Sequence, residues 1–115
     1  MRRLAAAALA LALGGCAGLD RPPPADPQAV AGAGFAARAC AGCHAVGLSG
    51  ASRDPAAPPF RVLATGFSDT RLEAELARVA RHGHGQMPPI YTTDDEQAAV
   101  LAYLRRLRLS VLPRA

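Results

Sequence analysis

The chain has 115 residues and a formal net charge of +4 at pH 7, from 13 basic residues, all of them arginine, and nine acidic ones. Half of its residues are hydrophobic, but 27 of these are alanine, and there are three Phe, two Tyr and no Trp. This length allows one small domain and excludes a multidomain enzyme. The few large apolar residues argue against an unaided apolar core, so a bound group should help to fill the interior. The arginines are not interleaved with aromatic residues, and we expect no nucleic-acid partner.

The N-terminal residues have the pattern of an export signal. Arg2 and Arg3 precede residues 4–13, a run of Leu and Ala that is much shorter than the ~20 apolar residues of a membrane-spanning helix. Residues 13–16 read LGGC and resemble a bacterial lipobox, whose cysteine is acylated and begins the mature chain. This resemblance implies a signal peptide over residues 1–15 and a lipid anchor on Cys16. The alternative is an ordinary secretory signal that leaves Cys16 as a free thiol.

A proline-rich tether follows over residues 16–27. Such segments prefer the extended polyproline II conformation, so this one would hold the next domain roughly 30 Å from a lipid surface. We assign that domain to residues 28–110 and a C-terminal tail to residues 111–115. The lipobox implies an exported protein, lipid-anchored on the periplasmic side, and Ala17 after the cysteine favours the outer membrane.

Residues 28–39 predict a helix that continues into CAGCH at residues 40–44. C-x-x-C-H is the pattern of c-type haem attachment. Cys40 and Cys43 would lie on one side of a helical turn and add to the two vinyl groups of one haem, while His44 supplies an imidazole nitrogen to the iron. A thioredoxin-like pair would need a βαβ pattern and a zinc site a second ligand pair, and the sequence offers neither. A structural disulfide would leave His44 unexplained. We therefore predict one covalently bound haem c.

Residues 45–67 are rich in Gly and Pro and are predicted to be loop. Pro58 or Pro59 is expected to offer its carbonyl to the second nitrogen of the ligand histidine, which would fix the tautomer of the ring. Phe60 is a candidate wall of the haem pocket. Arg61 is a candidate partner for a haem propionate, and the alternative is a solvated surface arginine.

Two further helices are predicted from their N-terminal caps. Ser68 precedes residues 70–82, where apolar residues recur at i, i+4 and i+7. Thr93 and Glu96 form a capping box before the last helix. Three arginines near the end of that helix suit the helix dipole and are expected to be a solvated end. The apolar positions are Leu72, Leu76 and Val79 in the first of these helices and Val100, Leu101, Leu104 and Leu107 in the second.

Met87 is the candidate for the second axial ligand of the haem iron. It is the one methionine beyond the signal region, and it lies in HGQMPP at residues 84–89. The two prolines exclude a helix and hold Met87 extended, so its thioether is presented from a stiff loop. The alternative is a methionine that fills a gap in the core. His82 or His84 would instead give a bis-histidine haem, and an open sixth position would suit a sensor or a peroxidase.

From about Pro27 to Leu109 the chain resembles a class I c-type cytochrome. The motifs that carry the resemblance are CAGCH at 40–44, APPF at 57–60, HGQMPP at 84–89 and AYLRRL at 102–107. The resemblance implies an all-α fold of three to four short helices around one covalently bound haem. In the family the first and last helices cross at a glycine and aromatic residues, and the matching positions are Gly32, Phe35, Val100 and Tyr103.

The resemblance implies a monohaem one-electron carrier that transforms no substrate and is not an enzyme. Ligation by Met87 would raise the haem potential relative to a bis-histidine haem. An electron donor and an acceptor, both unidentified, would dock transiently at the haem edge. Short bacterial members similar to this chain include subunits associated with dehydrogenases. The competing interpretations are a haem enzyme or sensor with a displaceable sixth ligand, and a structural lipoprotein whose cysteine pair is a disulfide.

Overall fold

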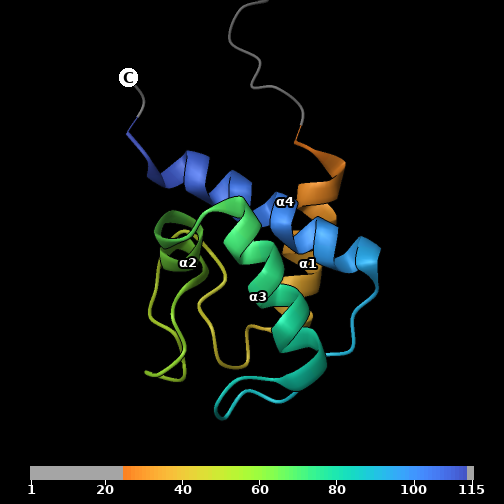
Figure 1. Ribbon diagram of the computed structural model, residues 1–115. Helices are drawn as coiled ribbons and strands as arrows, with labels where there is room; N and C mark the ends of the chain where they lie inside the picture. Colours follow the sequence, from red (N-terminus) through yellow and green to blue (C-terminus); the bar gives the residue numbers. More distant parts are fainter. Residues whose placement is uncertain (1–24, 114–115) are drawn as a thin grey trace, which may run out of the picture.

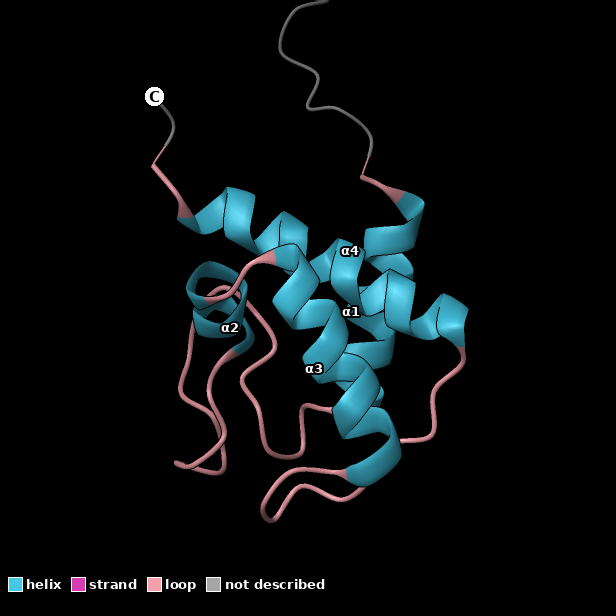
Figure 2. Ribbon diagram, in the orientation of Figure 1, coloured by secondary structure: helices cyan, strands magenta, loops and turns pink. Residues whose placement is uncertain are grey.

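The structure, a computed structural model, describes residues 25–113 (Figure 1). These residues form four helices and no strand: α1 (Pro27–Ala39), α2 (Phe60–Gly66), α3 (Asp69–His82) and α4 (Asp94–Val111). Figure 2 shows them as short helices joined by irregular segments. The expected all-α class is therefore confirmed. The predicted signal peptide, Cys16 and most of the tether lie outside the described residues.

Three helices begin at side-chain caps. Asp26 Oδ1 accepts a hydrogen bond from the Gln28 amide at 3.0 Å at the start of α1. Ser68 Oγ accepts one from the Arg71 amide at 3.2 Å and starts α3. Before α4 the predicted capping box is complete, because the Thr93 and Glu96 side chains each bond the other's backbone amide. The predictions for α3 and α4 are confirmed, since these caps satisfy amides that have no partner within a helix.

The loop prediction for residues 45–67 was wrong at its C-terminal end, which forms α2. Pro59 stands at the N-cap with a φ of −58° and a ψ of 144°, and this non-helical ψ is usual for the residue that precedes a helix. Phe60 and Ala64, one helical turn apart, are both buried. Two buried positions are too few to produce a visible helical periodicity, so the Gly and Pro residues nearby dominated the prediction.

The first and last helices cross at Gly32, as the resemblance implied (Figure 1). A β-carbon on Gly32 would overlap the backbone carbonyl of Ala99 and would lie 3.0 Å from Cβ of Tyr103. The missing side chain therefore allows α1 and α4 to approach closely. The Tyr103 hydroxyl donates a hydrogen bond to the Val46 carbonyl and attaches α4 to the loop after the CAGCH motif.

The core lies between α1, α4 and the faces of α2 and α3 that point toward them. The four apolar residues predicted to face inward from α4 are all buried, and Leu72 of α3 is buried with them, whereas Leu76 and Phe35 are partly buried. The buried cluster comprises Ala36, Phe60, Ala64, Leu72, Val100, Leu101, Leu104 and Leu107.

The arginines at the end of α4 were expected to be a solvated end, which holds for the exposed Arg105 and Arg106 but was wrong for the largely covered Arg108. Arg105 and Arg108 both bind the Asp69 carboxylate at the start of α3, Arg105 at 2.7 Å. Arg108 also donates to the Ala64 and Phe67 carbonyls at the end of α2. The hydrogen bonds that Arg105 and Arg108 donate to the Asp69 carboxylate hold its pKa below the ordinary value. Arg108 therefore joins three helices, because its fork of donors reaches two unpaired carbonyls and a carboxylate.

Candidate haem-binding site

The CAGCH motif continues the last turn of α1. The Cys40 and Ala41 amides donate to the Ala36 carbonyl, and the Cys43 and His44 amides donate to the Cys40 carbonyl at 3.2 and 2.9 Å. No disulfide joins Cys40, which is half-buried, to Cys43, which is exposed. Burial raises the pKa of the Cys40 thiol above its ordinary value. The motif is therefore a helical turn, and of its three predicted haem residues Cys40 and His44 line the cavity described below whereas Cys43 does not.

The orientation of the His44 ring is fixed from two sides. Its Nδ1 lies 2.7 Å from the carbonyl oxygen of Pro58, one of the two prolines considered for this contact. A carbonyl only accepts hydrogen bonds, so Nδ1 carries the proton and Nε2 keeps its lone pair for a metal. The Phe60 ring packs edge-on against the imidazole, with centroids 5.6 Å apart. The Phe60 amide donates to the Ala45 carbonyl at 2.9 Å and holds this segment against the motif.

A cavity of about 460 Å³ opens beside this group, and its walls are mainly apolar. Its size is within the ~300–1,000 Å³ range of small-molecule and cofactor sites. Cys40, His44 and Met87 all line the cavity, although 43 residues separate His44 from Met87. The apolar walls come from all four helices and from the segment before α4: Phe35, Phe60, Leu63, Phe67, Leu72, Leu76, Val79, Ala80, Ile90, Val100 and Leu104.

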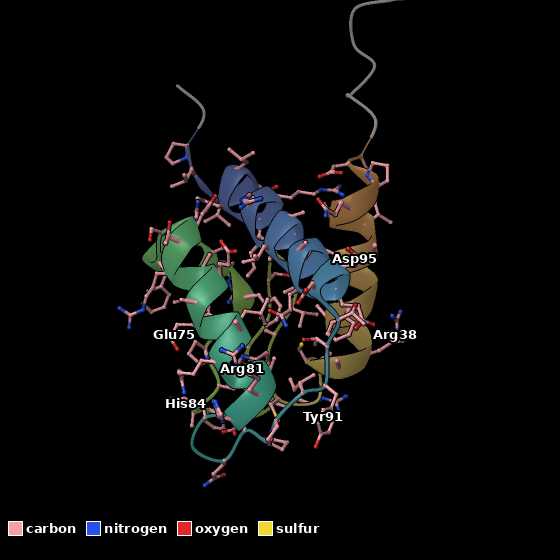
Figure 3. The ribbon with its side chains drawn as sticks, turned by 45° about the vertical axis from the view of Figure 1, so that its right-hand side comes forward. Arg38, Glu75, Arg81, His84, Tyr91 and Asp95 are labelled. Atoms are coloured by element: carbon pink, nitrogen blue, oxygen red, sulfur yellow. The ribbon has the colours of Figure 1, made fainter. Side chains whose placement is uncertain are left out.

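Met87 stands at the end of a tight turn that follows α3. The His84 amide donates to the Met87 carbonyl at 2.9 Å, and the Met87 amide donates to the His84 carbonyl at 2.8 Å. Gly85 within the turn has a φ of +56°. His84 also lines the cavity, whereas His82 is exposed at the end of α3 and is not among the lining residues. Figure 3 shows His84 at the end of the molecule away from the start of α1.

Gly83 links α3 to this turn and should not tolerate a side chain. Its φ of 68° and ψ of −170° belong to a region that is essentially restricted to glycine. A β-carbon would also overlap the Met87 carbonyl and lie 3.0 Å from the Pro88 carbonyl carbon. We expect Gly83→Ala to lower the unfolding free energy by about 1–3 kcal/mol and to displace Met87. Denaturant unfolding and carbon monoxide binding by the reduced holoprotein measure the two effects.

Gly85→Asn is the matched control for Gly83→Ala. Gly85 also has a positive φ, but nothing lies within 4 Å of its β-carbon position, and asparagine tolerates that conformation. The control should unfold close to wild type and should bind no carbon monoxide. Equal behaviour of the two variants would show that the close approach of Gly83 to Met87 has no role in holding the turn.

Two of the four candidate pocket residues lie elsewhere. Pro58 and Phe60 line the cavity, but Pro59 and Arg61 line a separate shallow hollow in the loop before α2. Arg61 Nη2 donates to the Gly50 carbonyl at 2.8 Å, while its buried Nη1 has no hydrogen-bond partner among the described residues. Arg61 thus helps to close this loop and is not among the residues that line the cavity.

The charged residues at the rim of the cavity were not predicted from the sequence. Arg71, Glu75 and Arg78 of α3 line it together with the predicted apolar stripe of that helix. Glu75 forms ion pairs with Arg71 at 3.2 Å and with Arg78 at 2.7 Å. Arg71 also lies over the Phe67 ring, 5.7 Å from its centroid. The sequence offered one sign of these ion pairs, because Arg71 and Glu75 are four residues apart and Glu75 and Arg78 three apart on the same helix.

The residues around the cavity fit a covalently bound haem. An imidazole with a free Nε2 and a thioether line the same apolar cavity, and a thiol stands in its wall. No group of three or more His, Cys, Asp or Glu side chains within residues 25–113 could hold a metal ion in another way. Histidine and methionine side chains are a donor set that a haem iron can take as its two axial ligands.

Comparison with known proteins supports a c-type haem-binding domain. A protein-family model described as "Cytochrome C oxidase, cbb3-type, subunit III" matches residues 27–104, from the start of α1 into α4. No curated protein and no solved structure matches the chain. The matched segment contains CAGCH, the Pro58 segment and Met87.

Proposed function

The chain belongs to the family of cytochrome c oxidase, cbb3-type, subunit III, and from this premise we propose that it carries single electrons at a haem iron ligated by His44 and Met87. Family membership makes it a monohaem c-type cytochrome with one covalent haem c. The observation that carries the ligand assignment is the cavity that both side chains line. The oxidase assembly named in the family description is not part of the proposal.

The two cysteines hold the cofactor and the histidine orients toward it. In thioether formation each thiol adds across a vinyl C=C bond, with sulfur bonding one carbon and hydrogen the other. Pro58 keeps the proton of His44 on Nδ1 and so presents Nε2 as a neutral ligand. A bound haem supplies an iron that exchanges one electron between Fe(III) and Fe(II).

The remaining walls favour electron transfer over chemistry on a substrate. Apolar side chains from all four helices exclude water from the cavity. A low-dielectric surrounding disfavours the Fe(III) haem, which carries one more positive charge than the Fe(II) haem, and so raises the reduction potential. With both axial positions filled by protein side chains, no position is left for oxygen or a substrate. These properties suit a carrier that exchanges electrons with little rearrangement.

We further propose that acylated Cys16 attaches the protein to a membrane on the periplasmic side, and Ala17 after this cysteine favours the outer membrane. No helix within the described residues is long and apolar enough to span a bilayer. Figures 1 and 3 show that α1 begins at the end of the domain opposite to the turn with His84. A tether entering there would leave the Met87 side free for a redox partner, such as a dehydrogenase. Mass spectrometry of the mature N-terminal peptide tests the acylation.

Carbon monoxide binding by the reduced wild-type holoprotein tests the carrier function. We expect no binding at neutral pH, because Met87 occupies the position that carbon monoxide would need. Prompt, tight binding would contradict the carrier and support the enzyme or sensor with a displaceable ligand. A mature protein without covalent haem, after expression with a haem c maturation system, would support the disulfide-bonded lipoprotein instead.

A further inference from the structure

One guanidinium group connects α3 to the turn that carries Met87. Arg78 lies in the last turns of α3, and its side chain is half-buried. Its Nη1 donates to the Gly83 carbonyl at 3.4 Å, and its Nη2 lies 3.3 Å from Nδ1 of His84. His84 is the residue whose backbone forms both hydrogen bonds with Met87. Arg78 therefore contacts Gly83 and His84, the two residues that precede Gly85 in the turn.

The orientation of Arg78 is itself fixed by Glu75. Arg78 Nε and Nη2 both donate to Glu75 Oε2, at 2.9 and 2.7 Å. Arg71 holds the other oxygen of the same carboxylate at 3.2 Å. The hydrogen bond from Arg78 is the main reason why the pKa of Glu75 lies below its ordinary value, so this carboxylate is ionised at neutral pH. A planar guanidinium held along one edge presents its remaining donors in a fixed direction.

We propose that Arg78 is a positioning residue for the sixth ligand, and that Glu75 orients it. Arg78 attaches the turn at residues 84–87 to α3 and thereby keeps the thioether of Met87 aimed into the cavity. This inference rests on the proposed ligation by Met87. Its functional consequence is that Met87 resists displacement, as a carrier that must not open its sixth position requires.

Competition by imidazole, a small external ligand for ferric haem, measures how firmly Met87 is held. We expect Arg78→Gln in the holoprotein to bind imidazole about three- to tenfold more tightly than wild type. This change corresponds to the loss of one or two partly exposed charge-assisted hydrogen bonds. Glu75→Gln should shift the affinity in the same direction by less. The Met87 amide, which bonds to His84, should also exchange its hydrogen faster in Arg78→Gln.

Two controls separate positioning from general stability. Arg81 lies on the same helix and is exposed, and its side chain forms no hydrogen bond with another described residue, so Arg81→Gln should leave imidazole affinity unchanged (Figure 3). Arg108→Gln removes the ion pair of Arg108 with Asp69 and its contacts with the carbonyls at the end of α2, while the pair of Arg105 with Asp69 remains. This variant should unfold more easily than wild type without binding imidazole more tightly.

The outcomes distinguish this inference from the proposed ligation. If Met87→Ala binds imidazole far more tightly than wild type while Arg78→Gln equals wild type, Arg78 has no positioning role and the ligation stands. If Met87→Ala itself equals wild type, Met87 is not the ligand and both proposals fall. If Arg81→Gln or Arg108→Gln shifts affinity as much as Arg78→Gln, the effect is not specific to the turn, which also overturns the inference.

Discussion

Met87→Ala should give a holoprotein that binds carbon monoxide when reduced and whose reduction potential lies below that of wild type. Alanine has no donor atom, so the sixth position is left to water or to an external ligand. Loss of the thioether removes a ligand that favours Fe(II), and we expect the potential to fall by on the order of 0.1 V, given that axial ligands tune haem over ~0.8 V. Spectroelectrochemical titration measures the potential, and the reduced-minus-carbonyl spectrum measures binding.

The matched control for this prediction is His82→Ala. His82 is exposed and does not line the cavity, so its replacement should leave both the potential and carbon monoxide binding unchanged. His84 lines the cavity and is the available substitute ligand. A Met87→Ala spectrum identical to that of wild type would contradict methionine ligation, and the double variant with His84→Ala would then show whether His84 is the ligand.

The features predicted correctly from the sequence depend on short local patterns. CAGCH needs only five consecutive residues, and the caps at Ser68 and Thr93 need only the next turn of chain. The Gly-Pro composition around Met87 predicted an extended loop, and the turn observed there also depends on the φ of Gly83 and Gly85. Such patterns are readable because each one determines the conformation of the residues that contain it.

The features that were missed depend on contacts between distant segments. Arg108 binds the start of α3 and the end of α2, 39 to 44 residues away. No local sequence pattern distinguishes it from Arg106, two residues earlier. Arg61 was a candidate partner for a haem propionate, with a solvated surface arginine as the alternative. Its side chain turns instead to the Gly50 carbonyl, since the loop of residues 45–59 folds back on α2. The choice between Pro58 and Pro59 likewise depended on that fold.

Gly32→Ala should strongly destabilise the domain, although it adds a single methyl group. The added carbon would overlap the Ala99 carbonyl, which belongs to the backbone of α4 and cannot move by rotating a side chain. The two helices must therefore separate, and the buried cluster shared by Ala36 and Val100 must loosen. We expect the unfolding free energy of the holoprotein to fall by about 2–3 kcal/mol, the upper range for overpacking. Denaturant unfolding followed by far-ultraviolet circular dichroism measures it.

Gly34→Ala provides a control on the same helix with the opposite expected sign. The added carbon at Gly34 meets only the end of the Arg38 side chain, at 3.4 Å, and that side chain is free to shift. Alanine in place of glycine inside a helix stabilises it by roughly 0.5–1 kcal/mol, so Gly34→Ala should unfold later than wild type. Both variants gain the same helix propensity, and the difference between them isolates the cost of the closed crossing. Destabilisation of both by the same amount would refute the role given to Gly32, because it would show that α1 tolerates no methyl at either face.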